Sequence, residues 1–217
     1  MAVAEDGRYA VVGKAQRKID ASDKVAGRTR FVDDLALPRM LHAKLLRSPH
    51  AHARIVSIDT TGAEALEGVK AVLTGKQLPI PFGILPVSQD EHVLAPDIVR
   101  FVGDPVVAVA AISEDVATEA LDLIQVEYDP LPHITSPEQA ITTQNPLIHD
   151  YGDRGNLHKL VNLEFGDVDK AFESVQHVRE DILFYGGSTH LAMEQHGALA
   201  EYSPDGKLTL WSSTQTP

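Results

Sequence analysis

Residues 104–128 read DPVVAVAAISEDVATEALDLIQVEY and contain the clearest structural pattern of the chain. Pro105 opens an apolar run over 106–112, which is long enough for a strand buried on both faces. Ser113 is suited to cap a helix that has an acidic first turn and an apolar stripe at helical spacing. Residues 126–128 then begin another strand. This order of elements predicts a right-handed crossover that packs the helix on a sheet. No glycine-rich phosphate loop accompanies the unit, so nucleotide binding is not indicated there.

Short elements precede this unit. Residues 41–46 alternate loosely between apolar and polar side chains and predict a strand. Residues 62–66 predict a short helix closed by Gly68, and the apolar segment 69–73 predicts the strand that follows. The first half of the chain therefore mixes short helices and strands, as expected of an α/β (α+β) domain.

A second group of elements follows residue 156. Asp167 is suited to cap a short helix that continues through Val175, and residues 178–184 predict a strand. Residues 199–202 and 208–212 flank a Ser-Pro-Asp-Gly-Lys turn, whose composition favours a hairpin with a glycine at positive φ. The second strand of this hairpin has no closing element after it, so we expect an incomplete second domain whose exposed strand pairs with another segment or chain.

The stretch 47–55, RSPHAHARI, combines polar side chains with a proline. Pro49 lacks an amide hydrogen and disfavours helix in the preceding residue, so the stretch predicts an edge strand or a turn into a strand. His50, His52 and Arg54 would then share one strand face. Two imidazoles on one face are compatible with a metal site, but a third ligand is missing nearby, and we favour a polar seam on a packed surface. The two arginines are suited to pair with carboxylates between domains or subunits.

Composition limits the class of protein. With 217 residues and 43% hydrophobic content, the chain is long enough for two compact units. Its 31 acidic against 19 basic residues give a formal net charge of -12. A surface of that sign repels a phosphate backbone, so we expect no nucleic-acid partner.

Neither a membrane nor a disulfide is indicated. No segment approaches the roughly 20 apolar residues that span a bilayer, and the N-terminus lacks a signal pattern, so we expect a cytoplasmic protein that does not contact a membrane. The sequence contains no Cys. This chain can therefore supply no thiolate for an iron-sulfur cluster, and any such cluster must lie on a partner.

Four segments are predicted along the chain. Residues 1–20 form an N-terminal arm without clear periodicity, and residues 21–132 form an α/β domain. The polar, proline-containing segment 133–156 is a predicted linker. Residues 157–217 are the incomplete start of a second domain.

Several segments resemble the molybdenum-binding subunit of the xanthine dehydrogenase family of molybdenum hydroxylases. The first part of the chain is similar to the family's N-terminal "hammerhead" α/β domain. The residues that carry this resemblance are Asp23, Lys24, Val25, Gly27, Phe31, Asp33, the run Arg47 to Ile55, Gly103, Asp104, Pro105, Val106 and the run Val126 to Pro132. The resemblance implies a hammerhead-type domain in the first half of the chain.

The second part resembles the opening of the family's molybdopterin-binding domain. It does so through Gly166, Asp167, Val168, His190, Met193, Glu194 and the run Ser212 to Pro217. Within the family, Pro81, Phe82, Gly83, Leu85 and Pro86 are most similar to the large subunit of 4-hydroxybenzoyl-CoA reductase. The resemblance therefore implies a molybdopterin-type molybdenum cofactor that residues outside this chain complete.

The resemblance also implies a reaction and partners. Family members transfer electrons between the molybdenum centre and Fe-S clusters and FAD on other subunits. Their substrates are small molecules: aromatic, heterocyclic, aldehyde or aryl-CoA compounds. The usual reaction hydroxylates an electron-poor carbon with oxygen from water; the 4-hydroxybenzoyl-CoA reductase likeness would instead imply reductive removal of a phenolic hydroxyl. The glycine-rich pterin-binding segments and the catalytic glutamate of the family lie beyond Pro217, so we expect the chain not to be catalytic alone.

One active-site position is carried over by the resemblance. Thr214, Gln215 and Pro217 match a family motif in which the glutamine amide approaches an oxo ligand of molybdenum. An amide can donate to such an oxygen without competing as a charged ligand, so Gln215 is the candidate for both cofactor binding and support of catalysis. A glutamine at the end of a strand can also satisfy nearby backbone groups, and only the motif favours the molybdenum role.

Two further features have competing interpretations. His190 and Glu194 are four residues apart with His196 beyond them, but the adjacent Glu of a zinc-protease helix is missing, so we assign no metal ligand there. The proline-rich loop from Leu78 to Pro86 is compatible with a substrate funnel, a subunit contact or an ordinary stiff surface loop.

The preferred function is thus part of a multi-subunit molybdenum-dependent oxidoreductase. The alternative is a non-catalytic interaction module that docks on an oxidoreductase or a maturation factor. A neighbouring reading frame that encodes the remaining pterin-binding segments would favour the first.

Overall fold

The described residues form two compact units in the computed structural model of the chain. The structure describes residues 9, 11–83, 88–189, 191, 192 and 194–214. One unit spans Pro38–Tyr185, and the other combines the segment up to Leu37 with the segment from Gly186 onward. Each unit is treated separately below.

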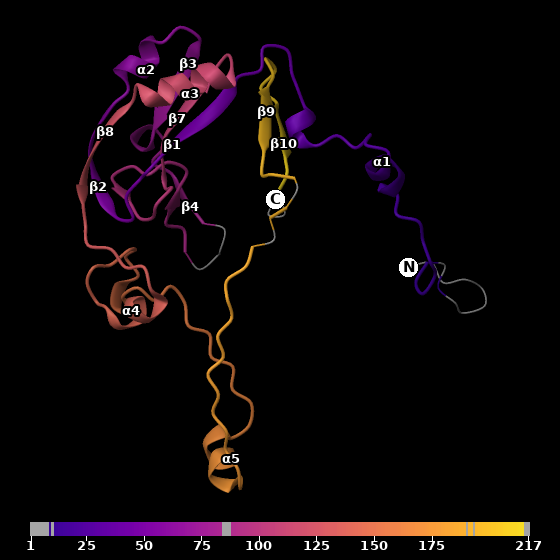
Figure 1. The fold of residues 1–217 in the computed structure, drawn as a ribbon, viewed down its shortest axis with the longest axis vertical. Coiled ribbons are helices and arrows are strands. Elements are labelled where there is room, and N and C mark those ends of the chain that lie inside the picture. Colours follow the sequence, from indigo (N-terminus) through magenta and orange to yellow (C-terminus); the bar gives the residue numbers. More distant parts are fainter. Residues whose placement is uncertain (1–8, 10, 84–87, 190, 193, 215–217) are drawn as a thin grey trace. The chain divides into compact units, whose positions relative to one another are not determined.

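The larger unit is built on two three-stranded antiparallel sheets. The first has the order β1 (His42–Arg47), β7 (Pro105–Ala111) and β3 (Val69–Thr74). The second has the order β6 (Ile98–Val99), β2 (Ala53–Asp59) and β8 (Gln125–Pro130). Helices α2 (Thr61–Ala65) and α3 (Glu114–Asp122) cover one face of the first sheet, and Figure 1 shows them above it.

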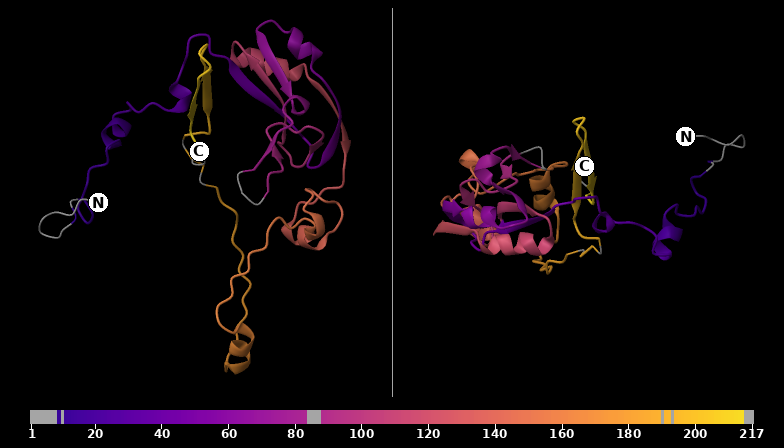
Figure 2. Two further views of the ribbon diagram at one scale, coloured as in Figure 1. Left: turned by 180° about the vertical axis from the view of Figure 1, so that it is seen from behind. Right: turned by 90° about the horizontal axis from the view of Figure 1, so that it is seen from above.

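Smaller elements complete this unit. A two-stranded hairpin joins β4 (Pro81–Phe82) to β5 (Glu91–His92), and a 3-10 turn, η2 (Gly75–Gln77), precedes it. The later part contains α4 (Pro137–Thr142), the 3-10 turn η3 (Gly152–Arg154) and α5 (Val168–Ser174). Figures 1 and 2 show α5 at the tip of two extended, irregular segments of the chain that lie outside the sheets.

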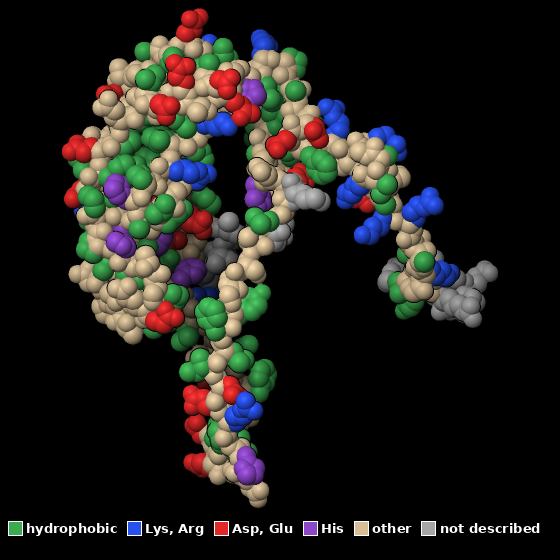
Figure 3. Space-filling model, in the orientation of Figure 1, with side chains coloured by type: hydrophobic (Ala, Val, Ile, Leu, Met, Phe, Trp, Pro, Cys, Tyr) green, Lys and Arg blue, Asp and Glu red, His purple; other side chains and the backbone are tan. Residues whose placement is uncertain are grey.

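The predictions for β7 and α3 are confirmed. Strand β7 is central in its sheet, and its Val106, Val107 and Val109 are fully buried. Ser113 caps α3, because its Oγ accepts from Val116 N at 3.2 Å, and Ala117 and Ala120 on the inner side of the helix are buried. The apolar stripe of α3 therefore packs against the sheet, while its acidic side chains are exposed and lie over this part of the surface in Figure 3.

The predicted crossover is wrong. Strands β7 and β8 belong to different sheets, and both pair antiparallel with their neighbours. Strand β7 already has a hydrogen-bonded neighbour on each side, so β8 finds its backbone partners along β2 instead. Helix α3 therefore packs on the first sheet and connects it along the chain to a strand of the second.

The stretch 47–55 joins the two sheets and confirms the second of the two predicted alternatives, a turn into a strand. Strand β1 ends at Arg47 and β2 begins at Ala53, with a turn between them. His50 packs edge-on against Tyr128 at 4.9 Å between ring centroids, whereas His52 Nδ1 lies 2.7 Å from the Pro132 carbonyl. The prediction that His50, His52 and Arg54 share one strand face is wrong, because the turn places the two imidazoles against different neighbours. Polar side chains of this stretch form hydrogen bonds within the fold; for example, Arg47 donates to the Gly103 carbonyl at 2.9 Å.

A buried polar contact connects this turn to the start of β7. Ser48 is 3% exposed; its backbone N–H donates to the Asp104 carbonyl at 2.9 Å, and Gly103 N–H donates to the Ser48 carbonyl at 2.8 Å. The Asp104 side chain is 8% exposed and accepts from Arg100 N–H at 2.9 Å. Gly103 has a φ of 97°, which favours glycine in this tight turn.

The smaller unit contains α1 (Ala21–Val25), the 3-10 turn η1 (Val32–Asp34) and the hairpin of β9 (Ala198–Tyr202) and β10 (Leu208–Ser212). The predicted hairpin is confirmed, and Gly206 in its turn has a φ of 85°. The predicted helix cap is also confirmed in the larger unit, where Asp167 accepts from Lys170 N–H at 3.0 Å at the start of α5.

The predicted strand over 178–184 is wrong. These residues have no strand assignment, and Ile182, Leu183 and Phe184 are more than 90% exposed. A strand needs a neighbouring strand to satisfy its backbone groups, and none of the described residues pairs with this segment.

Asp104→Ala should destabilise the larger unit by about 1–3 kcal/mol, because it removes the acceptor of the Arg100 amide in a buried position. Asp104→Asn keeps an acceptor oxygen and should cost less. Urea unfolding of the full chain, followed by far-UV circular dichroism, measures both variants. Equal stability of the alanine variant and the wild type would contradict this role.

Asp104 also predicts a pH dependence. Burial raises the pKa of Asp104 above its ordinary value of 3.8, and the Arg100 amide only partly offsets this effect. The Asp104 carboxyl therefore stays protonated to higher pH in the folded state than in the unfolded state. Its protonated form thus contributes stability at low pH, and this contribution is lost as pH rises through the raised pKa. From about pH 4 upward, the unfolding free energy of wild type should fall relative to Asp104→Asn. A difference that stays constant with pH would contradict it.

Candidate functional site

A hollow lies in the smaller unit beside the end of β10. Its cavity volume is about 820 Å³. Three segments line it: the chain at η1, residues around the start of β9, and the end of β10. The lining residues are Arg30, Phe31, Val32, Leu35, Ala192, Glu194, His196, Trp211, Ser212, Ser213 and Thr214.

Ser213 fixes the chain where it leaves β10. Its Oγ accepts from Gly197 N–H at 2.8 Å and donates to the Gln195 carbonyl at 2.9 Å. Its backbone N–H donates to the Gly197 carbonyl at 3.1 Å, and His196 Nδ1 lies 3.2 Å from the Ser213 carbonyl. These contacts extend the hairpin by a further pair of residues beyond Ser212.

The opposite wall of the hollow approaches the hairpin closely at one residue. A Cβ added to Gly197 would lie 3.1 Å from Val32 Cγ1 and 3.4 Å from Asp33 Oδ1. The wall itself is held by Asp34, whose carboxylate accepts from Phe31 N–H at 2.9 Å and whose carbonyl accepts from the Arg30 guanidinium at 3.2 Å. Gly197 therefore lets η1 pack directly on the hairpin.

The candidate residue Gln215 lies outside the described residues. The described chain reaches Thr214, which lines the hollow. The predicted role of Gln215 stays a prediction.

The His190, Glu194 and His196 pattern is only partly described. His190 lies outside the described residues, whereas Glu194 and His196 both line the hollow. Within the described part of the chain, no group of three His, Cys, Asp or Glu side chains is arranged to hold a metal ion. His196 instead contacts a backbone carbonyl of the hairpin.

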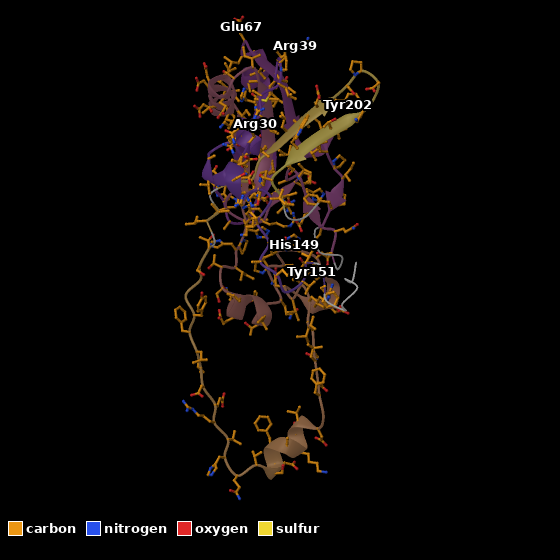
Figure 4. The ribbon with its side chains drawn as sticks, turned by 90° about the vertical axis from the view of Figure 1, so that its right-hand side faces the viewer. Arg30, Arg39, Glu67, His149, Tyr151 and Tyr202 are labelled. Atoms are coloured by element: carbon orange, nitrogen blue, oxygen red, sulfur yellow. The ribbon has the colours of Figure 1, made fainter. Side chains whose placement is uncertain are left out.

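Sequence reasoning missed a second polar cluster, which lies in the larger unit. A cavity of about 330 Å³ is lined by Asp90, His149, Tyr151 and His158, among others. Figure 4 labels His149 and Tyr151, whose rings stack at 5.5 Å between centroids. The sequence offered one signal of this cluster: polar residues at alternate positions in two segments, Ser88 with Asp90 and His149 with Tyr151. Nothing local indicated that the two segments meet.

The sequence matches two family models in succession. Residues 26–132 match the aldehyde oxidase and xanthine dehydrogenase a/b hammerhead domain, and residues 148–217 match the molybdopterin cofactor-binding domain. The chain belongs to the xanthine dehydrogenase family of molybdenum hydroxylases. The predicted fold class, a hammerhead-type domain followed by the start of a molybdopterin-binding domain, is confirmed.

Curated relatives agree with this family. The chain is 41% identical over 211 residues to the nicotinate dehydrogenase large molybdopterin subunit of Eubacterium barkeri, covering 96% of this chain and 48% of the relative. It is 39% identical over 208 residues to a probable xanthine dehydrogenase subunit of Bacillus subtilis strain 168, covering 94% of this chain and 27% of the relative. The chain thus spans between about a quarter and a half of these relatives.

Solved structures show the same fold. Quinoline 2-oxidoreductase from Pseudomonas putida 86 is 35% identical with a TM-score of 0.80, covering 94% of this chain and 27% of that one. Aldehyde oxidoreductase from Desulfovibrio gigas is 26% identical with a TM-score of 0.81, covering 99% of this chain and 25% of that one. Among the residues that the structure describes, no helix is long and apolar enough to cross a bilayer.

Gly197→Ala should weaken the packing of η1 on the hairpin, because Val32 must move to make room for the new methyl group. We expect a loss of about 1–3 kcal/mol, typical of overpacking. Fluorescence of Trp211, the single tryptophan of the sequence, reports unfolding at this site. Gly187→Ala is the matched control, because its added Cβ meets no heavy atom within 4 Å. Identical urea midpoints for the two variants would contradict the close approach.

Proposed function

We propose that this chain forms the hammerhead region and the opening of the molybdopterin-binding domain in a molybdenum hydroxylase-type oxidoreductase. The observation that supports it is the succession of two family matches, 26–132 and 148–217, in one chain. The substrate class is a small aromatic, heterocyclic, aldehyde or aryl-CoA compound. The likeness to 4-hydroxybenzoyl-CoA reductase, and with it the direction of the reaction, stays a prediction.

The hollow beside β10 fits the edge of a cofactor that carries its own metal. Its described lining includes the hydroxyls of Ser212 and Thr214, the Trp211 indole and the Arg30 guanidinium. The same described residues provide no cluster of three metal-ligating side chains, as a metal held directly by protein would need. When bound, the cofactor would exchange electrons with the substrate and with further redox centres.

In this proposal the chain's own residues orient the cofactor. Ser213 holds the end of β10 beside the hollow. Gln215, two residues further on, would donate its amide N–H to an oxygen of the molybdenum group. Its neutral charge lets it act as a donor without displacing a metal ligand.

Partner subunits supply the remaining redox centres in this proposal. The 217 residues contain no Cys, so no thiolate of this sequence can hold a cluster. We therefore propose an Fe-S subunit, an FAD subunit and a polypeptide that completes the molybdopterin-binding domain. The cytoplasmic location and the domain boundaries at residues 20, 132 and 156 also stay predictions.

The alternative, a non-catalytic docking module, is not favoured. The curated relatives are described as subunits of nicotinate and xanthine dehydrogenases and as the carbon monoxide dehydrogenase large chain. None of these descriptions indicates a module separated from an oxidoreductase.

Purification of the chain from its native host, with everything that co-purifies, tests the proposal. We expect molybdenum and iron, measured by inductively coupled plasma mass spectrometry, together with a larger pterin-binding polypeptide in the subunit masses. A metal-free preparation without such a partner would favour the docking module instead.

In such a complex, Gln215→Ala should change the Mo(V) electron paramagnetic resonance signal and lower activity by about 10–100-fold, as loss of a residue that orients a metal group does. Molybdenum content serves as the check that the cofactor is still loaded. Gln125→Ala, an exposed glutamine on β8, is the control. An unchanged signal and full activity in Gln215→Ala would show that Gln215 does not act on the molybdenum group.

A further inference from the structure

The β4–β5 hairpin has too little backbone pairing to hold itself in place. Among the described residues of this hairpin, two pairs, Pro81 with His92 and Phe82 with Glu91, join its strands. Isolated two-stranded hairpins are marginally stable in water, and this one is far shorter than most. Contacts outside the hairpin must therefore fix its returning strand.

Those contacts come from the segment 146–158, more than fifty residues further along the chain. His149 Nδ1 lies 2.7 Å from Asp90 Oδ2, and His158 Nε2 lies 2.7 Å from Ser88 Oγ. Tyr151 lies between the two imidazoles: its ring stacks on His149 and is tilted against His158 at 5.2 Å. The returning strand of the hairpin is thus held by polar side chains at alternate positions.

The segment 146–158 is itself closed into a compact loop. Asn156 accepts from Ile148 N–H at 2.9 Å and donates to the carbonyls of Pro146 at 2.9 Å and Thr143 at 3.2 Å. The Arg100 guanidinium donates to the Ile148 carbonyl at 2.9 Å. The loop is therefore anchored to the turn before β7 as well as to the hairpin.

Charged groups surround the central contact from each neighbouring element. The Asp90–His149 contact has Glu91 and His92 beside it on the hairpin, and Arg100 and Asp104 beside it on the turn before β7. The loop contributes Arg154, whose guanidinium lies 5.6 Å from the centre of the Tyr151 ring. Burial alone would raise the pKa of Asp90, but the charge of protonated His149 and the hydroxyls of Tyr151 and Ser88 lower it overall. Asp90 is therefore ionised at neutral pH, so Asp90→Asn removes its charge. Burial also lowers the pKa of His149.

We propose that the Asp90–His149 and Ser88–His158 contacts form a latch that makes the segment 88–92 and the loop 146–158 open and close as one unit. The match to the molybdopterin cofactor-binding domain begins at residue 148. The latch therefore joins the hammerhead domain to the opening segment of the next family domain, and that segment folds with the hammerhead core. Neither the family matches nor the proposed function requires this coupling.

Hydrogen exchange of the full chain, in whatever complex it forms, tests the latch by mass spectrometry. Asp90→Asn should speed exchange about tenfold in peptides that cover 88–92 and also in peptides that cover 146–158. His158→Gln, which changes the loop side of the Ser88–His158 contact, should speed exchange in the same two segments. The double variant Asp90→Asn with His149→Gln should exchange no faster than the faster single variant, because residues in one contact are not additive.

Glu91→Gln is the matched control, since it removes the same charge from the neighbouring residue, which lines the same cavity but makes no described hydrogen bond or ion pair with the loop. Hydrogen exchange in β7 reports whether a variant has lost the whole fold. If Asp90→Asn speeds exchange in β7 as well, Ser88→Ala replaces it as the milder test. If each variant speeds exchange only in its own segment, or if Glu91→Gln has the same effect as Asp90→Asn, the latch is wrong.

Discussion

The architecture of the larger unit depends on the reciprocal backbone hydrogen bonds between Ser48 and the Gly103–Asp104 turn. They join two segments more than fifty residues apart at the point where one sheet gives way to the other. Because Ser48 and Asp104 are buried, their polar groups need internal partners. The Asp104 carboxylate and Arg47 complete this requirement by bonding to neighbouring backbone atoms. The polar run 47–55 is thus a structural corner that connects the two sheets.

The apolar core builds outward from that corner. Val106, Val107 and Val109 of β7 lie fully buried together with Ala53 of β2 and Val99 of β6. Small residues such as Ala63 and Ala120 let the two helices approach the sheet closely. By contrast, large apolar side chains between residues 160 and 185 are mostly exposed, with Phe165 at 85% and Phe184 at 96%. The stable core of the larger unit therefore lies before residue 160.

The smaller unit positions the candidate site by other means. It has little buried apolar surface, and its geometry rests on the hairpin ladder, on the Ser213 hydroxyl and on the close approach allowed by Gly197. These contacts fix the end of the hairpin as far as Ser213. A family whose cofactor carries its own metal needs such oriented donors more than it needs protein ligands. The lining of the hollow, in which Arg30, Ser212 and Thr214 lie beside apolar side chains, is consistent with that requirement.

The sequence by itself determined the elements whose causes are local. The Ser113 cap and apolar stripe of α3, the Asp167 cap of α5, the buried run of β7 and the Gly206 turn all depend on residues a few positions apart. The family assignment also followed from residues readable in order along the chain. Only the tertiary structure decided that β8 pairs with β2 and not beside β7, that 178–184 lacks a strand partner, and that Asp90 meets His149. Such pairings depend on which distant segments still have free backbone or side-chain partners once the core has formed, and no local pattern encodes that competition.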